Sequence, residues 1–103
     1  MGADVEGNEF ENAVSYVQNL KPAGKIQPSN TAKLMFYALY KQAVDGQNKT
    51  SAPSRLKVVD RAKWTAWSKL GNMSKNDAKS RYIAELAKVD PNWKSNSQPK
   101  SKL

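Results

Sequence analysis

The sequence contains neither cysteine nor histidine in its 103 residues. Disulfide frameworks and thiol chemistry are therefore excluded, and the usual ligands of a transition-metal site are missing. No pair of carboxylates is set among apolar residues, so neither an acid–base nor a nucleophilic arrangement can be assembled. The sequence predicts a protein that is not an enzyme, holds no metal and needs no cofactor.

Long hydrophobic runs are also lacking. The longest one covers residues 34–40, whereas a membrane-spanning helix takes about 20 apolar residues. The first twenty residues have neither the basic region nor the apolar region of a signal peptide. We therefore expect a soluble, intracellular and monomeric protein without a transmembrane segment, and its length predicts a single domain.

Acidic residues are scarce after position 20. The chain has 17 basic and 9 acidic residues, for a net charge of +8. Residues 1–20 hold Asp4, Glu6, Glu9 and Glu11 and no basic residue. A chain with one acidic end and a strongly basic remainder predicts an anionic partner, which could be nucleic acid, anionic lipid headgroups or a phosphorylated metabolite.

The apolar periodicity predicts four helices and no strand. The expected helices cover about residues 8–20, 31–45, 59–70 and 75–89, with candidate N-caps at 29–31 and at Ser74. Residues 47–58 form a long connection, and such a connection usually crosses the fold or carries function. Residues 94–103 have no apolar residue before the last one, which predicts disorder.

The second predicted helix has two distinct faces, of which the second is unusual. At 100° per residue, one stripe is apolar and typical of a core-facing helix, and it contains Ala32, Phe36, Leu39 and Ala43. A second face interleaves phenols and ammonium groups, and it contains Lys33, Tyr37, Tyr40, Lys41 and Val44. Aromatic rings beside cations suit a ligand that offers both a flat ring and a phosphate.

Two polar side chains interrupt apolar stripes on the later helices. Lys63 can lay its stem on the core and lift its ammonium group to water, and Tyr82 can be an ordinary core tyrosine. Alternatively, both take part in a site with Tyr37, Tyr40 and Lys41, because three helices then direct a cation or a phenol toward the apolar side of the bundle.

Several motifs in one order resemble the acyl-CoA-binding protein family. They are Phe36-Tyr37-Ala38-Leu39-Tyr40-Lys41-Gln42-Ala43 followed by Gly46, then Ala62-Lys63-Trp64-Thr65-Ala66-Trp67, then Met73-Ser74 and Tyr82. The resemblance implies an all-α, four-helix up-down-down-up bundle with a long overhand connection between helices two and three. It places an N-terminal extension at 1–7, the acyl-CoA-binding domain at 8–90 and a flexible tail at 91–103.

The resemblance also implies a ligand, a medium- to long-chain fatty acyl-CoA that the protein buffers or carries to acyl-CoA-using enzymes. In such proteins the residues matching Tyr37, Lys41 and Lys63 engage the 3′-phosphate. The residue matching Tyr40 packs on adenine, and the one matching Tyr82 contacts the CoA. Further contacts are expected at Ala38, Leu39 and Gln18, although Gln18 stands where a lysine often occurs.

The chain ends in Ser101-Lys102-Leu103. At a free C-terminus this tripeptide is an import signal read by a peroxisomal receptor. The sequence therefore predicts a peroxisomal location if this end is native, and a cytoplasmic one otherwise.

A rival interpretation comes from residues 64–93, which resemble the second half of an HMG-box DNA-binding domain. That fold is small, basic and helical, and it binds the minor groove. Its usual first helix and Pro-rich N-terminal strand have no counterpart here, and the acidic first helix would repel phosphate. We therefore expect no nucleic-acid partner.

Overall fold

The computed structural model describes residues 7–96, and these form five helices without any strand. The helices are α1 (Gly7–Gln18), α2 (Asn30–Asp45), α3 (Val58–Ser68), α4 (Lys75–Val89) and α5 (Trp93–Asn96). The four long helices lie within two residues of the ranges expected from the sequence. The all-α prediction is thus confirmed for the described part of the chain.

Local side-chain caps fix where two of these helices begin. The Ser29 hydroxyl accepts a hydrogen bond of 3.0 Å from the Ala32 amide, and the Ser74 hydroxyl accepts one of 3.0 Å from Asp77. Each cap satisfies an amide that the first helical turn leaves unpaired. At the other end of α2, Gly46 adopts a φ of 84°, a conformation that side chains with a Cβ rarely adopt.

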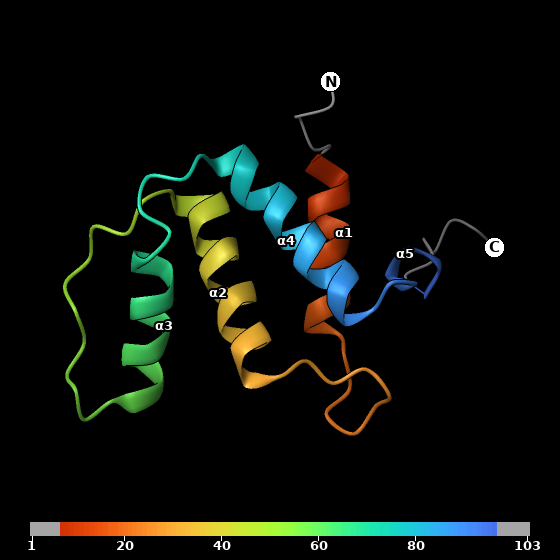
Figure 1. Cartoon of the computed structure of the whole chain (residues 1–103), viewed down its shortest axis with the longest axis horizontal. Coiled ribbons are helices and arrows are strands. Elements are labelled where there is room, and N and C mark those ends of the chain that lie inside the picture. The colour runs from red at the N-terminus through yellow and green to blue at the C-terminus, as the bar shows by residue number, and fades with distance from the viewer. Residues whose placement is uncertain (1–6, 97–103) are drawn as a thin grey trace.

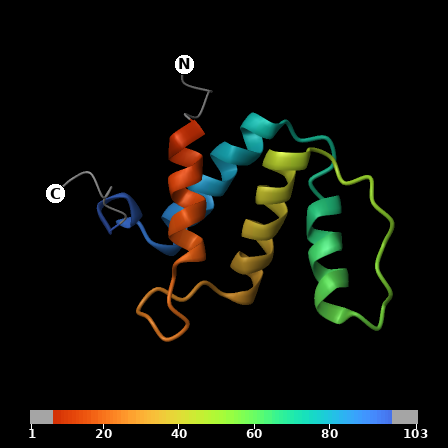
Figure 2. The ribbon, with the colours of Figure 1, turned by 180° about the vertical axis from the view of Figure 1, so that it is seen from behind.

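The helices follow an up-down-down-up order (Figure 1). In that view α1 and α4 run downward, whereas α2 and α3 run upward side by side. Parallel neighbours need a long connection, and residues 46–57 supply it by passing back along α3, as the reverse view also shows (Figure 2). The predicted four-helix topology with its overhand connection is confirmed.

Helix α2 is the centre of the bundle, because it packs against both α3 and α4 while α1 packs against α4. The core contains Phe10, Ala13, Phe36, Leu39, Ala43, Ala78, Tyr82, Leu86 and Trp93. The Tyr82 ring lies between two phenylalanines, with centroids 5.4 Å from Phe10 and 5.1 Å from Phe36. The apolar stripe predicted for the second helix is therefore the one that faces the core.

A buried amide ties the turn between α3 and α4 to the end of α2. Gln42 is fully buried, and its Nε2 donates to the carbonyls of Gly71 and Met73 at 3.0 and 2.8 Å. Because these carbonyls lie in the turn, the amide holds the start of α4 against α2.

The ordered part of the chain extends past residue 90, which corrects the expectation of a flexible tail over 91–103. Trp93 in α5 is 4% exposed and packs on Tyr16 of α1, with ring centroids 6.2 Å apart. Tyr16 donates a hydrogen bond to the buried Asp90, and Lys94 forms an ion pair of 2.9 Å with Glu9. One tryptophan with these polar contacts is enough to dock the segment 91–96 on α1.

The expected N-terminal extension and the rest of the expected tail lie outside the described residues, apart from Gly7, which begins α1. Among residues 7–96, every helix is too short or too polar to span a bilayer. The same residues contain no cluster of acidic side chains that could hold a metal ion.

Candidate functional site

The connection between α2 and α3 is fastened along the side of α3 by hydrogen bonds from tryptophan and asparagine side chains. Trp64 Nε1 donates to the Thr50 carbonyl at 3.1 Å, and Trp67 Nε1 donates to the Gly46 carbonyl at 2.9 Å. Asn48 Nδ2 donates to the Ser68 hydroxyl at 2.8 Å. The connection is thereby held as a fixed wall.

This wall, α2 and α3 enclose a pocket of about 390 Å³, here called the α2–α3 pocket. Its lining comprises Tyr37, Lys41, Thr50, Ser51, Pro53, Asp60, Lys63, Trp64 and Trp67. The structure therefore brings together Tyr37, Lys41 and Lys63, the three side chains expected to engage a phosphate.

Both ammonium groups of the pocket lie against aromatic rings. Lys63 Nζ is 5.4 Å from the centroid of the Tyr37 ring, and Lys41 Nζ is 5.0 Å from that of Trp67. Such cation–π contacts hold a cation over an apolar wall without neutralising its charge. The pocket can therefore offer two positive charges and a phenol to one anion.

The two lysines differ in their counterions. Lys41 Nζ lies 2.7 Å from a carboxylate oxygen of Asp45, one helical turn further along α2. The hydrogen bond to Asp45 raises the pKa of Lys41 above its ordinary value. Among the described residues, no carboxylate forms an ion pair with Lys63. Lys63 is thus the ammonium group of this pocket that an incoming anion can reach without displacing a carboxylate.

A second pocket of about 460 Å³ lies on the neighbouring face of α2 and is here called the α1–α2 pocket. Its lining comprises Phe10, Glu11, Val14, Ser15, Gln18, Tyr40, Ala43, Val44 and Lys79. Tyr40 and Gln18 therefore lie in a different pocket from Tyr37. Since Tyr37 and Tyr40 are three residues apart on one helix, their side chains are neighbours on its surface, and a ligand lying across α2 can touch both.

Tyr40 is supported from behind by α1. Its ring is nearly parallel to that of Phe10, with centroids 6.3 Å apart and an interplanar angle of 19°. On the same pocket, Lys79 Nζ lies 5.7 Å from the Phe10 ring centroid. A flat ring that enters the α1–α2 pocket therefore meets the 37% exposed Tyr40 and a nearby ammonium group.

Three residues expected at the site are buried in the core. Ala38 and Leu39 have no exposed surface, and neither lines the α2–α3 or the α1–α2 pocket. Tyr82 is 2% exposed, and its burial raises the pKa of its phenol. This placement agrees with the interpretation of Tyr82 as a core tyrosine, since almost no ring surface remains for direct contact.

The sequence interpretation missed several residues that line the two pockets. Trp64 and Trp67 are visible in the Lys-Trp-x-x-Trp motif, but their role as fasteners of the connection depends on where residues 46–50 pass. Phe10 and Lys79 come from helices far apart in the sequence, and no local pattern places them beside Tyr40.

Comparison with known proteins agrees with the resemblance seen in the sequence motifs. The family model described as "Acyl CoA binding protein" matches residues 7–86. Acyl-CoA-binding domain-containing protein 5 of Xenopus laevis is 48% identical over 80 residues, which cover 78% of this chain and 17% of that protein. Acyl-CoA-binding protein homolog 3 of Caenorhabditis elegans is 40% identical over 78 residues, covering 76% of this chain and 67% of that one.

Solved structures give the same picture. The crystal structure of ACBP from Moniliophthora perniciosa has a TM-score of 0.81 at 28% identity, covering 95% of this chain and 89% of that chain. The solution structure of acyl CoA binding protein from Babesia bovis has a TM-score of 0.74 at 36% identity, covering 90% and 98%. The whole bundle, and not only its motifs, is therefore similar to these proteins.

Proposed function

Since the chain belongs to the acyl-CoA-binding protein family, we propose that it binds medium- to long-chain fatty acyl-CoA esters and buffers or carries them for the enzymes that use them. The observation that supports this most strongly is the convergence of Tyr37, Lys41 and Lys63 on the α2–α3 pocket. The protein acts in this proposal by binding, without a chemical step of its own.

The α2–α3 pocket is suited to the 3′-phosphate of CoA. A phosphate dianion accepts charge-assisted hydrogen bonds from ammonium groups and phenols, and Lys63, Lys41 and Tyr37 supply them. Lys41 can donate to the phosphate with another of its three N–H groups, although the neighbouring Asp45 carboxylate offsets part of the attraction.

The α1–α2 pocket is suited to the adenine ring. Tyr40 offers a ring face that Phe10 holds in place, and a base stacked on such a ring gains about 1–3 kcal/mol. The nucleotide would then lie across α2, with its base on Tyr40 and its phosphate beside Tyr37. Gln18, which lines the same pocket, becomes a polar contact in place of a cationic one.

A third pocket of about 310 Å³ offers a place for the end of the acyl chain. It lies under the connection between α1 and α2, and its apolar lining comprises Val17, Leu20, Pro22, Ile26 and Pro28. Lys33 also lines it, and Lys33, Tyr37 and Lys41 follow one another at i, i+4 spacing on one face of α2. A chain that leaves the phosphate pocket along this face reaches the third pocket one turn later.

A calorimetric series with free CoA and acyl-CoA esters of increasing length tests the function. We expect one ligand per chain and an affinity that rises with acyl length until the groove is filled. Free fatty acid should bind poorly, because it lacks the nucleotide. Equal affinity for short duplex DNA at physiological salt would contradict the proposal and favour the HMG-box alternative, which none of the comparisons supports.

The proposed destination depends on Ser101, Lys102 and Leu103, which lie outside the described residues. We expect the last ten residues, fused to a fluorescent reporter, to direct it to peroxisomes through the import receptor. A diffuse cytoplasmic signal that stays unchanged when Leu103 is deleted would remove the peroxisomal proposal and leave acyl-CoA binding unaffected.

A further inference from the structure

The turn that leads into α3 presents an apolar patch to solvent. Leu56 is 91% exposed, Val58 72% and Val59 65%. The other exposed large hydrophobic side chains among the described residues are Tyr40 and Val44, at 37% and 47%, and both line a pocket. Residues 55–59, here called the tip, therefore carry the most exposed apolar side chains in the described part of the chain, and a cluster of this kind marks an interaction surface.

The tip is held in shape by hydrogen bonds that do not involve its apolar side chains. The Ser54 hydroxyl and carbonyl accept hydrogen bonds from the amides of Leu56 and Lys57, at 3.1 and 3.0 Å. Arg61 Nη1 donates to the Pro53 carbonyl at 2.9 Å. Because the fold does not need the side chain of Leu56, its exposure calls for another explanation.

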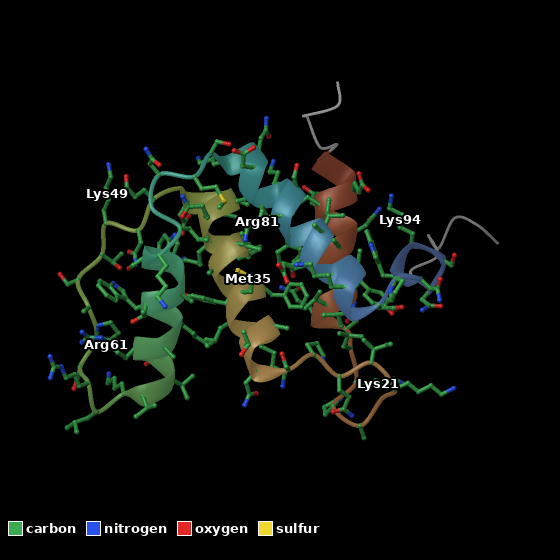
Figure 3. All side chains as sticks on the ribbon, viewed as in Figure 1. Lys21, Met35, Lys49, Arg61, Arg81 and Lys94 are labelled. Atoms are coloured by element: carbon green, nitrogen blue, oxygen red, sulfur yellow. The ribbon has the colours of Figure 1, made fainter. Side chains whose placement is uncertain are left out.

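Basic residues surround the apolar ones. Arg55 and Lys57 flank Leu56 in the sequence, and both are exposed. Arg61 lies on the outer side of the lower part of α3 (Figure 3). Asp60 is the one acidic residue between positions 46 and 76. Apolar side chains that alternate with cations suit an interface in which acyl chains lie below anionic headgroups.

The position of the tip also favours a flat anionic surface. It lies at the lower end of α3 in Figures 1 and 2, on the far side of the bundle from α1 and α5. Helix α1 carries Glu9 and Glu11. Lys94 pairs with Glu9, so the α1 side has little net charge, and an anionic surface attracts the tip more strongly than α1, which orients the molecule as it approaches.

We propose that the tip docks on anionic membranes, with Leu56, Val58 and Val59 entering the headgroup region and Arg55 and Lys57 contacting lipid phosphates. A folded protein partner is less suited to it, since a stable interface buries about 1,000 Å² or more and the tip is a protruding turn with three apolar side chains. A few apolar side chains and two cations give weak, reversible membrane binding, comparable to that of a single lipid anchor.

The docking also has a consequence for the α2–α3 pocket. Asp60 follows Val59 directly and lines that pocket, as does Pro53. A docked tip therefore holds this side of the pocket near the lipid surface. The membrane contact itself does not depend on which ligand the pocket takes.

Co-sedimentation of the full chain with vesicles tests this proposal. We expect binding to phosphatidylcholine vesicles that contain phosphatidylserine, and little binding to phosphatidylcholine alone. The double variant Arg55→Gln/Lys57→Gln should lower partitioning about 30-fold, since each basic residue near such a surface contributes about five-fold. Leu56→Ser should lower it about ten-fold or more, the factor expected for one leucine that loses its apolar contact.

The matched control is Lys69→Gln at the opposite end of α3. Lys69 is exposed like Lys57, so this variant changes the net charge as much as the single variant Lys57→Gln does. Lys57→Gln should lower partitioning about five-fold, whereas Lys69→Gln should keep full binding. Circular dichroism should show the same fold for all variants, because none of the replaced side chains is buried. Acyl-CoA binding, measured in parallel, should also be unchanged.

Three outcomes would overturn the proposal. If Lys69→Gln weakened binding as much as Lys57→Gln alone, the attraction would come from overall charge and not from the tip. If Leu56→Ser bound vesicles as tightly as the natural sequence, or if the natural sequence did not bind and the tip instead cross-linked to an acidic protein, insertion into lipid would be wrong. A loss of acyl-CoA binding with intact vesicle binding would contradict only the proposed function.

Discussion

Lys41 and Lys63 line one pocket, yet their different counterions predict that they contribute unequally to anion binding. Lys63 rests on the Tyr37 ring and has no carboxylate partner among the described residues, whereas Lys41 is paired with Asp45. An anion therefore reaches Lys63 without meeting an ion-paired carboxylate, whereas at Lys41 it competes with Asp45. The two residues look equivalent in the sequence, and only the structure separates them.

This difference predicts unequal losses on mutation. Lys63→Ala should weaken acyl-CoA binding by about 1.5–3 kcal/mol, the usual range for hydrogen bonds to charged groups, and Lys41→Ala should weaken it by less. Titration calorimetry of both variants measures the losses, and Lys69→Ala serves as a control of equal charge. A larger loss for Lys41→Ala than for Lys63→Ala would contradict this account of the pocket.

Asp45→Asn provides the complementary test. The substitution removes the carboxylate that pairs with Lys41 and frees the ammonium group for the ligand. Because the pair is partly exposed, with side-chain accessibilities of 30% and 46%, we expect a modest gain in affinity of about 0.2–1 kcal/mol. Calorimetry at low and high salt should show the gain shrinking as salt screens the charges. An unchanged or weaker affinity at low salt would show that Asp45 does not compete with the ligand.

The buried carboxylate of Asp90 predicts a dependence of stability on pH. Its hydrogen bond from Tyr16 holds the pKa of Asp90 below its ordinary value. A group with a lowered folded-state pKa stabilises the fold above its unfolded value of about 3.9, and this stability is lost as the pH falls through the folded-state pKa. Urea unfolding should therefore show a steeper loss of free energy below about pH 4 in the natural sequence than in Asp90→Asn. Identical pH profiles for the two proteins would contradict this role.

At the scale of elements, the sequence predicts the features that depend on interactions between residues close together in the chain. The caps Ser29 and Ser74 and the stop at Gly46 act within one turn of the chain, so local residue types are enough to predict all three. The short helix α5 escapes prediction, because four residues show no periodicity and its order comes from contacts with α1. Long-range contacts also explain why the sequence predicts one face of phenols and cations on α2 where the structure has two pockets. The residues of α1, α3 and the connection that separate these pockets are distant in the sequence.

Helix α5 offers a stability test at this scale. Trp93→Ala removes a side chain that is 4% exposed and part of the core, so it should lower the free energy of unfolding by about 3–5 kcal/mol. Lys94→Ala breaks only the surface pair with Glu9 and should cost no more than about 1 kcal/mol. Chemical denaturation measures both. A small loss for Trp93→Ala would show that the segment after residue 90 is not part of the cooperative unit.

At the scale of the whole molecule, the four-helix arrangement makes α2 the shared wall of every proposed ligand contact. Its face with Tyr37 and Lys41 closes one pocket, its face with Tyr40 and Val44 closes another, and Lys33 lines the third. In the proposed binding mode, the adenine ring, the phosphate and the acyl chain of one ligand occupy these three pockets along α2. The net charge of +8 adds a long-range attraction for this anion.

The most direct test of this account compares palmitoyl-CoA with its 3′-dephospho analogue by titration calorimetry on the natural sequence and on Lys63→Ala. The account predicts one ligand per chain, a loss of about ten-fold or more for the analogue, and a much smaller effect of Lys63→Ala on the analogue than on palmitoyl-CoA. If the two ligands bound the natural sequence equally, or if Lys63→Ala weakened both by the same factor, the phosphate anchor in the α2–α3 pocket would be wrong.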